Sequence, residues 1–235
     1  MDGITSLFGT TVLQMPLWLD LLGLIVGSVF GGLTAAERKL DVVGAMGLAM
    51  LCGMGGGLIR DMIMQVGNVY MLSTPYAIPA SITAGLLGYL FLRGFRHFPN
   101  SMEWLDMVAI SLFAAAGADK AMLYGLGGWA CVLMGTMTAV GGGMLRDVFL
   151  GDVPQIFRHS NLYALCAVMG SLVYWLVAQL DVNRIWAVIA CFVVTIGLRR
   201  LSLRFDIQTP DTIDLTDTVA HPLRHHRDTR DEKSD

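Results

Sequence analysis

Long apolar runs alternate with short polar connections along most of this chain. Each run approaches or reaches the roughly 17–25 residues that a helix needs to cross a bilayer. We therefore predict an all-α polytopic membrane protein with seven transmembrane helices. The predicted spans are residues 17–36, 42–59, 76–92, 104–118, 128–145, 161–179 and 184–198.

The composition supports the membrane class. Hydrophobic residues make up 54% of the 235 residues and charged residues only 15%, against about 25% charged in a typical soluble domain. Residues 204–235 contain eight acidic and five basic side chains, so this segment alone accounts for the net charge of −3. We therefore expect this protein to lie in a lipid bilayer and to have no nucleic-acid partner.

The two ends of the chain differ from the apolar region. Residues 1–16 form a mixed N-terminal segment without a basic region or a small-residue cleavage site, so we expect no cleaved signal peptide. Residues 204–235 are polar and are predicted to be a disordered tail. The histidines of this tail are expected to be solvated rather than bound to a metal.

One motif occurs twice inside the apolar runs. The sequence Gly-Gly-Gly-x-x-Arg-Asp lies at residues 55–61 and returns 86 positions later at residues 141–147. When residues 19–90 are aligned with residues 105–176 at this offset, 12 of the 72 pairs are identical, and five of the 12 lie in the motif. Chance is therefore a weak explanation, and we predict an internal repeat.

The number of spans decides how the two repeats are related. The first repeat covers residues 17–92 and the second residues 103–179, with three predicted spans in each. Because three is odd, the second repeat must sit upside down relative to the first. Inverted repeats of this kind are a transporter architecture with the functional site at their interface. Residues 184–203 then form a seventh helix outside the repeats.

Basic residues favour one of the two predicted faces when the motif arginines are left out. The face with the larger number has Arg38, Lys39, Arg93, Arg96, Arg158, Arg199, Arg200 and Arg204. The opposite face has Lys120 and Arg184. Since cytoplasmic loops carry the excess of basic residues, we predict a multi-pass protein of the cell (inner or plasma) membrane. Its N-terminus is expected outside and its tail in the cytoplasm.

The repeated motif is costly for a membrane helix. Each glycine gives up ~0.8–1 kcal/mol of helical preference against alanine, and an arginine near the bilayer centre costs ~2.5–3.5 kcal/mol. A chain that accepts both costs twice is expected to gain a function from them. The candidate residues of a pore or substrate path are Gly55, Gly56, Gly57, Arg60, Asp61, Gly141, Gly142, Gly143, Arg146 and Asp147. Asp119 and Lys120 are further candidates for lining the path.

The same residues also have plainer interpretations. The glycines can serve close helix packing, and each Arg–Asp pair can anchor a helix end at the headgroups. Asp20 and Asp106 occupy equivalent repeat positions, and an acid in the first turn of a span is often explained by the helix dipole. Asp119 and Lys120 have no charged counterpart in the first repeat, and we favour snorkelling to the membrane surface over a place in the path.

An enzyme finds little support in this sequence. The sequence has no H-E-x-x-H, no G-x-S-x-G and no cluster with metal-ligand spacing, and the glycine motif lacks the Lys-Ser/Thr of a phosphate-binding loop. We therefore assign no catalytic residue, no metal site and no cofactor. The four cysteines all lie in apolar runs without a C-x-x-C spacing, which indicates buried free thiols.

With the doubled motif, three spans per repeat and a seventh span after them, the chain resembles the bacterial branch of the TRIC (trimeric intracellular cation) channel family. That branch overlaps bacterial proteins with a repeated glycine transporter domain. The resemblance covers about residues 17–203, and residues 117–121 are similar to the end of the family's fourth span. The basic lipid-binding motif of the animal members has no counterpart in this sequence.

The resemblance implies a homotrimer with one pore in each subunit and permeation of monovalent cations, chiefly potassium. It also implies second and fifth helices kinked at residues 55–57 and 141–143, with Arg60 and Arg146 beside the path. Three hypotheses remain open: a cation channel, a carrier of a small amino acid such as glycine, and a membrane scaffold that transports nothing. A bare glycine backbone beside a positive charge suits the first two equally.

Overall fold

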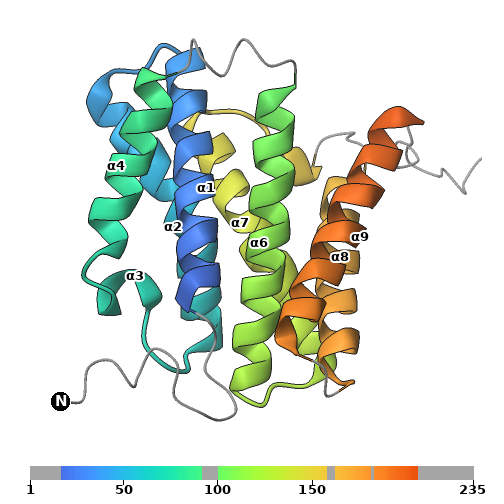
Figure 1. Ribbon diagram of the computed structural model, residues 1–235. Coiled ribbons are helices and arrows are strands. Elements are labelled where there is room, and N and C mark those ends of the chain that lie inside the picture. The colour runs from blue at the N-terminus through green and yellow to red at the C-terminus, as the bar shows by residue number, and fades with distance from the viewer. Residues whose placement is uncertain (1–16, 92–99, 158–161, 181–182, 206–235) are drawn as a thin grey trace, which may run out of the picture.

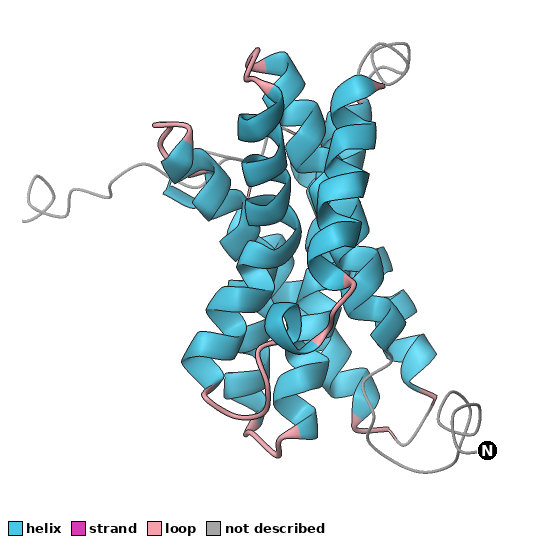
Figure 2. Ribbon diagram, turned by 90° about the vertical axis from the view of Figure 1, so that its left-hand side faces the viewer, coloured by secondary structure: helices cyan, strands magenta, loops and turns pink. Residues whose placement is uncertain are grey.

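The computed structural model describes residues 17–91, 100–157, 162–180 and 183–205, and these residues are helices joined by short loops (Figure 2). The predicted N-terminal segment and almost all of the predicted tail lie outside the described residues. The helices of the first repeat are α1 (Leu17–Glu37), α2 (Val42–Met64), α3 (Tyr70–Ser73) and α4 (Ala77–Leu90). Those that follow are α6 (Ser101–Leu123), α7 (Gly128–Phe149), the 3-10 turn η1 (Gln155–Phe157), α8 (Tyr163–Ala178) and α9 (Arg184–Arg204).

The long helices stand side by side as a bundle (Figure 1). In this view α1 and α4 run up the page and α2 runs down, whereas α6 and α8 run down and α7 runs up. Helices α1, α2, α6 and α7 pack together in the middle of the bundle, and α9 packs on α6 and α8 at one side. The connecting loops lie at the two ends of the bundle. We call the end with Arg60 the Arg60 face and the opposite end the Arg146 face.

Five helices are long and apolar enough to cross a membrane, namely α1, α2, α6, α7 and α9. Helices α4 and α8 are also apolar but have only 14 and 16 residues in the described part of the chain. The hydropathy pattern therefore located these seven helices. In the described part of the chain, α4 and α8 are shorter than their predicted spans.

The ends of α2 and α7 differ from the sequence prediction. We expected these spans to end at residues 59 and 145, but α2 continues to Met64 and α7 to Phe149. Helix is assigned at every residue of both glycine triplets, so the triplets interrupt neither helix. The helices continue because the Arg–Asp pairs are buried inside the bundle and do not mark its surface.

A residue with a left-handed φ angle follows α1, α2, α6 and α7. These residues occupy the same positions in the two repeats although their identities differ. Lys39 and Gly125, which are 86 positions apart, have φ angles of 58° and 71°. Gln65 and Gly151, again 86 positions apart, have φ angles of 50° and 73°. A left-handed residue just after a helix is a common way to end it. The repeat is thus kept in the backbone where it is lost in the sequence.

Glycines bring the helices close enough for their backbones to touch. A Cβ built on Gly31 would lie 2.7 Å from the Leu48 carbonyl oxygen, and one built on Gly117 would lie 2.6 Å from the Met134 carbonyl oxygen. These are the same contact in the two repeats. Small residues allow such packing where lipid supplies no hydrophobic force between helices. The four cysteines are free and buried, as predicted.

Candidate functional site

The first two glycines of each triplet pack α2 against α7. A Cβ on Gly56 would collide with the Thr138 carbonyl oxygen, and one on Gly142 would lie 2.7 Å from the Cys52 carbonyl oxygen. Thr138 and Cys52 are themselves 86 positions apart, so this contact is repeated as well. A Cβ on Gly141 would lie 3.2 Å from Gly56 Cα. The two triplets therefore meet where α2 and α7 cross.

The third glycine of each triplet has a different neighbour. A Cβ built on Gly57 would lie 3.8 Å from Nη2 of Arg60, and one on Gly143 would lie 4.0 Å from Nη2 of Arg146. These positions thus leave space beside the arginine head of the same helix. The triplet combines two functions, because Gly55 and Gly56 permit packing whereas Gly57 keeps the backbone bare at a charge.

The first Arg–Asp pair belongs to a buried charge cluster that we call the Arg60 cluster. Arg60 is fully buried and donates from Nε to Asp61 Oδ1 at 2.8 Å and from Nη1 to Asp20 Oδ1 at 3.2 Å. Lys120 donates to the same oxygen of Asp61 at 2.6 Å. The cluster contains two cations and two carboxylates, and a buried charge set is stable only when it is paired in this way.

Lys120 and its neighbour do not reach the membrane surface. Asp119 is fully buried and Lys120 is 8% exposed, so our preference for snorkelling was wrong. Asp119 accepts hydrogen bonds from Tyr174 at 2.6 Å and from Arg184, which fixes α6 to α8 and α9. Snorkelling fails because partners on neighbouring helices satisfy both charges inside the bundle.

The second Arg–Asp pair repeats the geometry of the first. Arg146 donates from Nε to Asp147 Oδ1 at 2.8 Å. The other oxygen of Asp147 accepts from the Gln155 backbone nitrogen at 2.9 Å, just as Asp61 Oδ2 accepts from the Tyr70 nitrogen at 2.8 Å. The aspartate of each motif therefore holds its arginine and also the start of the short helical turn that follows.

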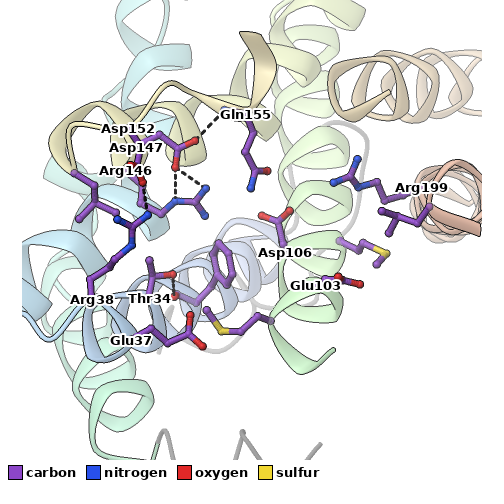
Figure 3. A pocket seen from close by; sticks show the side chains of 15 residues that line it. Thr34, Glu37, Arg38, Glu103, Asp106, Arg146, Asp147, Asp152, Gln155 and Arg199 are labelled. Carbon is purple, nitrogen blue, oxygen red and sulfur yellow. Dashed lines mark hydrogen bonds and ion pairs between the residues drawn. The ribbon is translucent and has the colours of Figure 1, made fainter. Parts of the chain in front are cut away.

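Arg146 differs from Arg60 because it borders a cavity of about 340 Å³. Side chains of α1, α6, α7 and α9 surround this cavity, and Asp106 lies between Arg146 and Arg199 in the view of Figure 3. Its charged lining consists of Glu37, Arg38, Glu103, Asp106, Arg146, Asp147, Asp152 and Arg199. Five carboxylates stand against three guanidinium groups, so the cavity carries a formal net charge of −2.

Two smaller cavities lie between the central helices. The first, of about 20 Å³, shares Phe30 and Asp106 with the large cavity. The second, of about 10 Å³, lies at Asp20 and Gly57 beside the Arg60 cluster. Phe113 lines both of them. Each has about the volume that one water molecule needs. The two small cavities therefore lie on either side of Phe113, one toward Arg146 and one toward the Arg60 cluster, and each is too small for a hydrated ion.

A family model described as glycine transporter matches residues 17–93 and matches again at residues 103–179. The two matches together cover more than half of the chain. The chain belongs to the glycine transporter family.

Relatives and solved structures of this family agree with the described fold. The inner membrane protein YadS of Escherichia coli K12, from the group called UPF0126, is 31% identical over 195 residues, which are 82% of this chain and 94% of YadS. A TRIC trimeric intracellular cation channel orthologue from Rhodobacter sphaeroides is 30% identical, covers 81% of this chain and 97% of its own, and superposes with a TM-score of 0.73.

A second structure, from work on conductance through TRIC cation channels, is 27% identical with a TM-score of 0.72 and covers 83% of this chain and 96% of its own. These matches confirm the resemblance to TRIC channels that the doubled motif indicated. Together with the apolar helices, they show that this member of the glycine transporter family is a multi-pass membrane protein.

Three residues of the candidate site did not follow from the sequence, namely Asp20, Asp106 and Phe113. We explained Asp20 and Asp106 by the helix dipole, yet Asp20 pairs with Arg60 and Asp106 accepts from the Tyr163 hydroxyl at 3.3 Å. Their equivalent positions in the two repeats were the signal that could have found them. Phe113 had no such signal, because its importance comes from the glycines that it contacts on another helix.

Proposed function

We propose that this protein is a TRIC-type channel that passes monovalent cations, chiefly potassium, through a pore in each subunit of a homotrimer. The observation that carries the proposal is the 340 Å³ cavity with a net charge of −2, which shares Phe30 and Asp106 with the 20 Å³ cavity between the central helices. A cleft lined by one sign of charge raises the local concentration of the opposite ion. The likeness to cation channels supports the same conclusion.

We propose that seven helices cross the membrane, as two inverted three-helix repeats followed by α9. The opposite directions of the corresponding helices in Figure 1 support this arrangement. In that arrangement the Arg146 face is cytoplasmic, because most of the basic loop residues lie on its side. The N-terminus then lies on the outer side of the inner membrane, and the tail lies in the cytoplasm. The acidic cavity accordingly opens to the cytoplasm.

Within this channel the two arginines have different tasks. Arg60 is paired with two carboxylates, and the 10 Å³ cavity lies beside it at Asp20 and Gly57. Arg146 pairs with Asp147 alone among the described carboxylates, lies 5.0 Å from the centre of the Phe30 ring and borders the large cavity. Arg146 therefore has the freedom to move, and we assign it the part of a charged gate at the mouth of the path.

Potassium flux is the direct test of the permeant. Purified protein in proteoliposomes is expected to release trapped potassium down its gradient, with sodium also passing and chloride retained, because the cavity is net negative. Empty liposomes are the control, and uptake of labelled glycine is measured in the same vesicles. Saturable glycine uptake without potassium flux would overturn the channel proposal.

Removing the positive charge of Arg146 is expected to raise the potassium current several-fold. Arg146→Ala changes the cavity from a net charge of −2 to −3 and removes a long side chain from its lining. Arg200→Ala is the matched control, since Arg200 stacks on the Trp104 ring at 4.3 Å and does not line the cavity. Single-channel recording in planar bilayers measures both variants. A current that is equal in Arg146→Ala and Arg200→Ala contradicts the gate.

A carrier for a small amino acid is the second candidate. Arg60 Nη2 is buried without a hydrogen-bond partner among the described residues, and Gly57 leaves the backbone beside it bare. A carboxylate is the group that such a guanidinium would bind. The 10 Å³ of space at this point is too small for any amino acid, which favours the channel in the conformation described. A scaffold without transport would show neither flux.

A further inference from the structure

Phe113 of α6 is the residue that lines both small cavities between the central helices. The side chain is 6% exposed and belongs to the main apolar core together with Ile110. It lines the 20 Å³ cavity on the side of Asp106 and the 10 Å³ cavity on the side of Asp20. An ion that moves from one small cavity to the other therefore passes this ring.

The ring rests on a bare part of α1. A Cβ built on Gly23 would lie 2.9 Å from Phe113 Cε1, and its three nearest atoms all belong to Phe113. A Cβ on Gly27 would lie 3.1 Å from Phe113 Cε2. The ring can occupy this position only because both α1 residues lack a side chain. Only apolar contact holds it there, so a small displacement of the ring or of α1 changes the width of the path.

Gly27 and Phe113 are also equivalent residues, since they are 86 positions apart. Two equivalent residues come into contact where the axis that relates the repeats passes between them. The same holds for Gly56 and Gly142, because a Cβ on Gly56 would lie 3.4 Å from the Gly142 nitrogen. The axis thus has two glycines on the side of α2 and α7, but a glycine and a phenylalanine on the side of α1 and α6.

We propose that Phe113 is a hydrophobic gate, which closes the path by filling the space that its glycine counterpart leaves on the repeat axis. Hydrophobic constrictions stop ions by excluding the water that an ion must carry. The ring lies between the Arg60 cluster and the charged cavity at Arg146. The small cavity on each side has room for about one water molecule, so the ring is the barrier between them. This proposal rests on the proposed function in that it requires a path through these cavities. It does not depend on which ion uses the path.

Potassium flux through the Phe113→Ala variant tests the gate. The variant is expected to raise basal flux by about ten-fold or more, because removal of the ring joins the two small cavities and lets water enter. Phe113→Leu keeps an apolar side chain of intermediate size and is expected to give an intermediate rise. Phe192→Ala on α9 is the matched control, because this ring packs on the same core but lines none of the described cavities. Flux in Phe113→Ala equal to that in Phe192→Ala overturns the gate.

A second readout needs no assumption about the permeant. Cys52 lines the 20 Å³ cavity, so it lies on the Arg146 side of the ring. In a variant whose other three cysteines are replaced by serine, silver ions added at the Arg60 face are expected to modify Cys52 about ten-fold faster after Phe113→Ala. Silver ions added at the Arg146 face should react at similar rates with and without the ring. An unchanged rate from the Arg60 face overturns the gate.

The two readouts separate the gate from the function. A faster silver reaction without potassium flux in any variant supports the gate and contradicts the potassium channel. Potassium flux that is unaffected by Phe113→Ala, together with an unchanged silver rate, supports the channel and contradicts the gate.

Discussion

Replacing Gly56 or Gly142 by alanine is expected to destabilise the protein by about 3 kcal/mol, the upper part of the usual range for overpacking. For a chain of this size the melting temperature should fall by about 6–12 °C. The reason is that a methyl group at either position meets a backbone carbonyl oxygen of the facing helix, Thr138 in one case and Cys52 in the other. A backbone atom cannot move aside as a side chain does, so α2 and α7 must separate. Thermal unfolding in detergent measures the effect.

Two other glycines serve as matched controls. Apart from the adjoining residues of its own helix, nothing in the described structure lies within 4 Å of a Cβ built on Gly47 of α2 or Gly197 of α9. Gly47→Ala and Gly197→Ala are therefore expected to leave the melting temperature unchanged or to raise it, since alanine favours a helix by ~0.8–1 kcal/mol over glycine. Equal melting temperatures for Gly56→Ala and Gly47→Ala would show that the triplet does not serve close packing.

Removing the charge of Asp61 is expected to cost about 3–5 kcal/mol, the typical result of taking one partner from a buried ion pair. Asp61→Asn leaves Arg60 and Lys120 buried with only Asp20 to balance them. Asp147→Asn is the matched control, because Arg146 borders the 340 Å³ cavity and water can solvate it there. We expect a loss of less than half that of Asp61→Asn, measured by thermal unfolding of both variants.

A second substitution tests the reason for this loss. Lys120→Met removes the extra cation, so the double variant Asp61→Asn/Lys120→Met should recover part of the stability that Asp61→Asn alone loses. In the double variant Arg60 still has Asp20 as its counter-ion. If Lys120→Met lowers the stability of Asp61→Asn further, the balance of charge in the Arg60 cluster is not what stabilises it.

The two copies of the motif have different surroundings, because Arg60 lies in a closed charge cluster whereas Arg146 borders a cavity. Both motifs hold an arginine against an aspartate with nearly the same distances. The first repeat receives Lys120 from α6, which seals the Arg60 cluster, whereas a cavity lies at the equivalent place beside Arg146. One Arg–Asp pair is therefore sealed by a second cation, and the other borders an accessible cavity.

The sequence by itself determined the helices, the repeat and the candidate motif of this protein. Hydropathy and a fixed offset are properties of the chain in one dimension, so the apolar runs and the doubled Gly-Gly-Gly-x-x-Arg-Asp can be read without a structure. The positions of Asp20 and Asp106 carried the same signal, and only a preference for the dipole explanation left them aside. The family followed from the same motif and is confirmed by the two matched repeats.

Only the tertiary structure decided which charges pair and which residues contact Phe113. Lys120 meets Asp61 across 59 positions, and Asp119 meets Arg184 across 65. Phe113 meets Gly27 at the repeat offset, but the sequence alone gives no reason to place a ring on that glycine. These contacts depend on how far apart the helices stand and how each is rotated about its axis. Backbone contacts between glycines set both quantities, and no pattern along a single helix contains them.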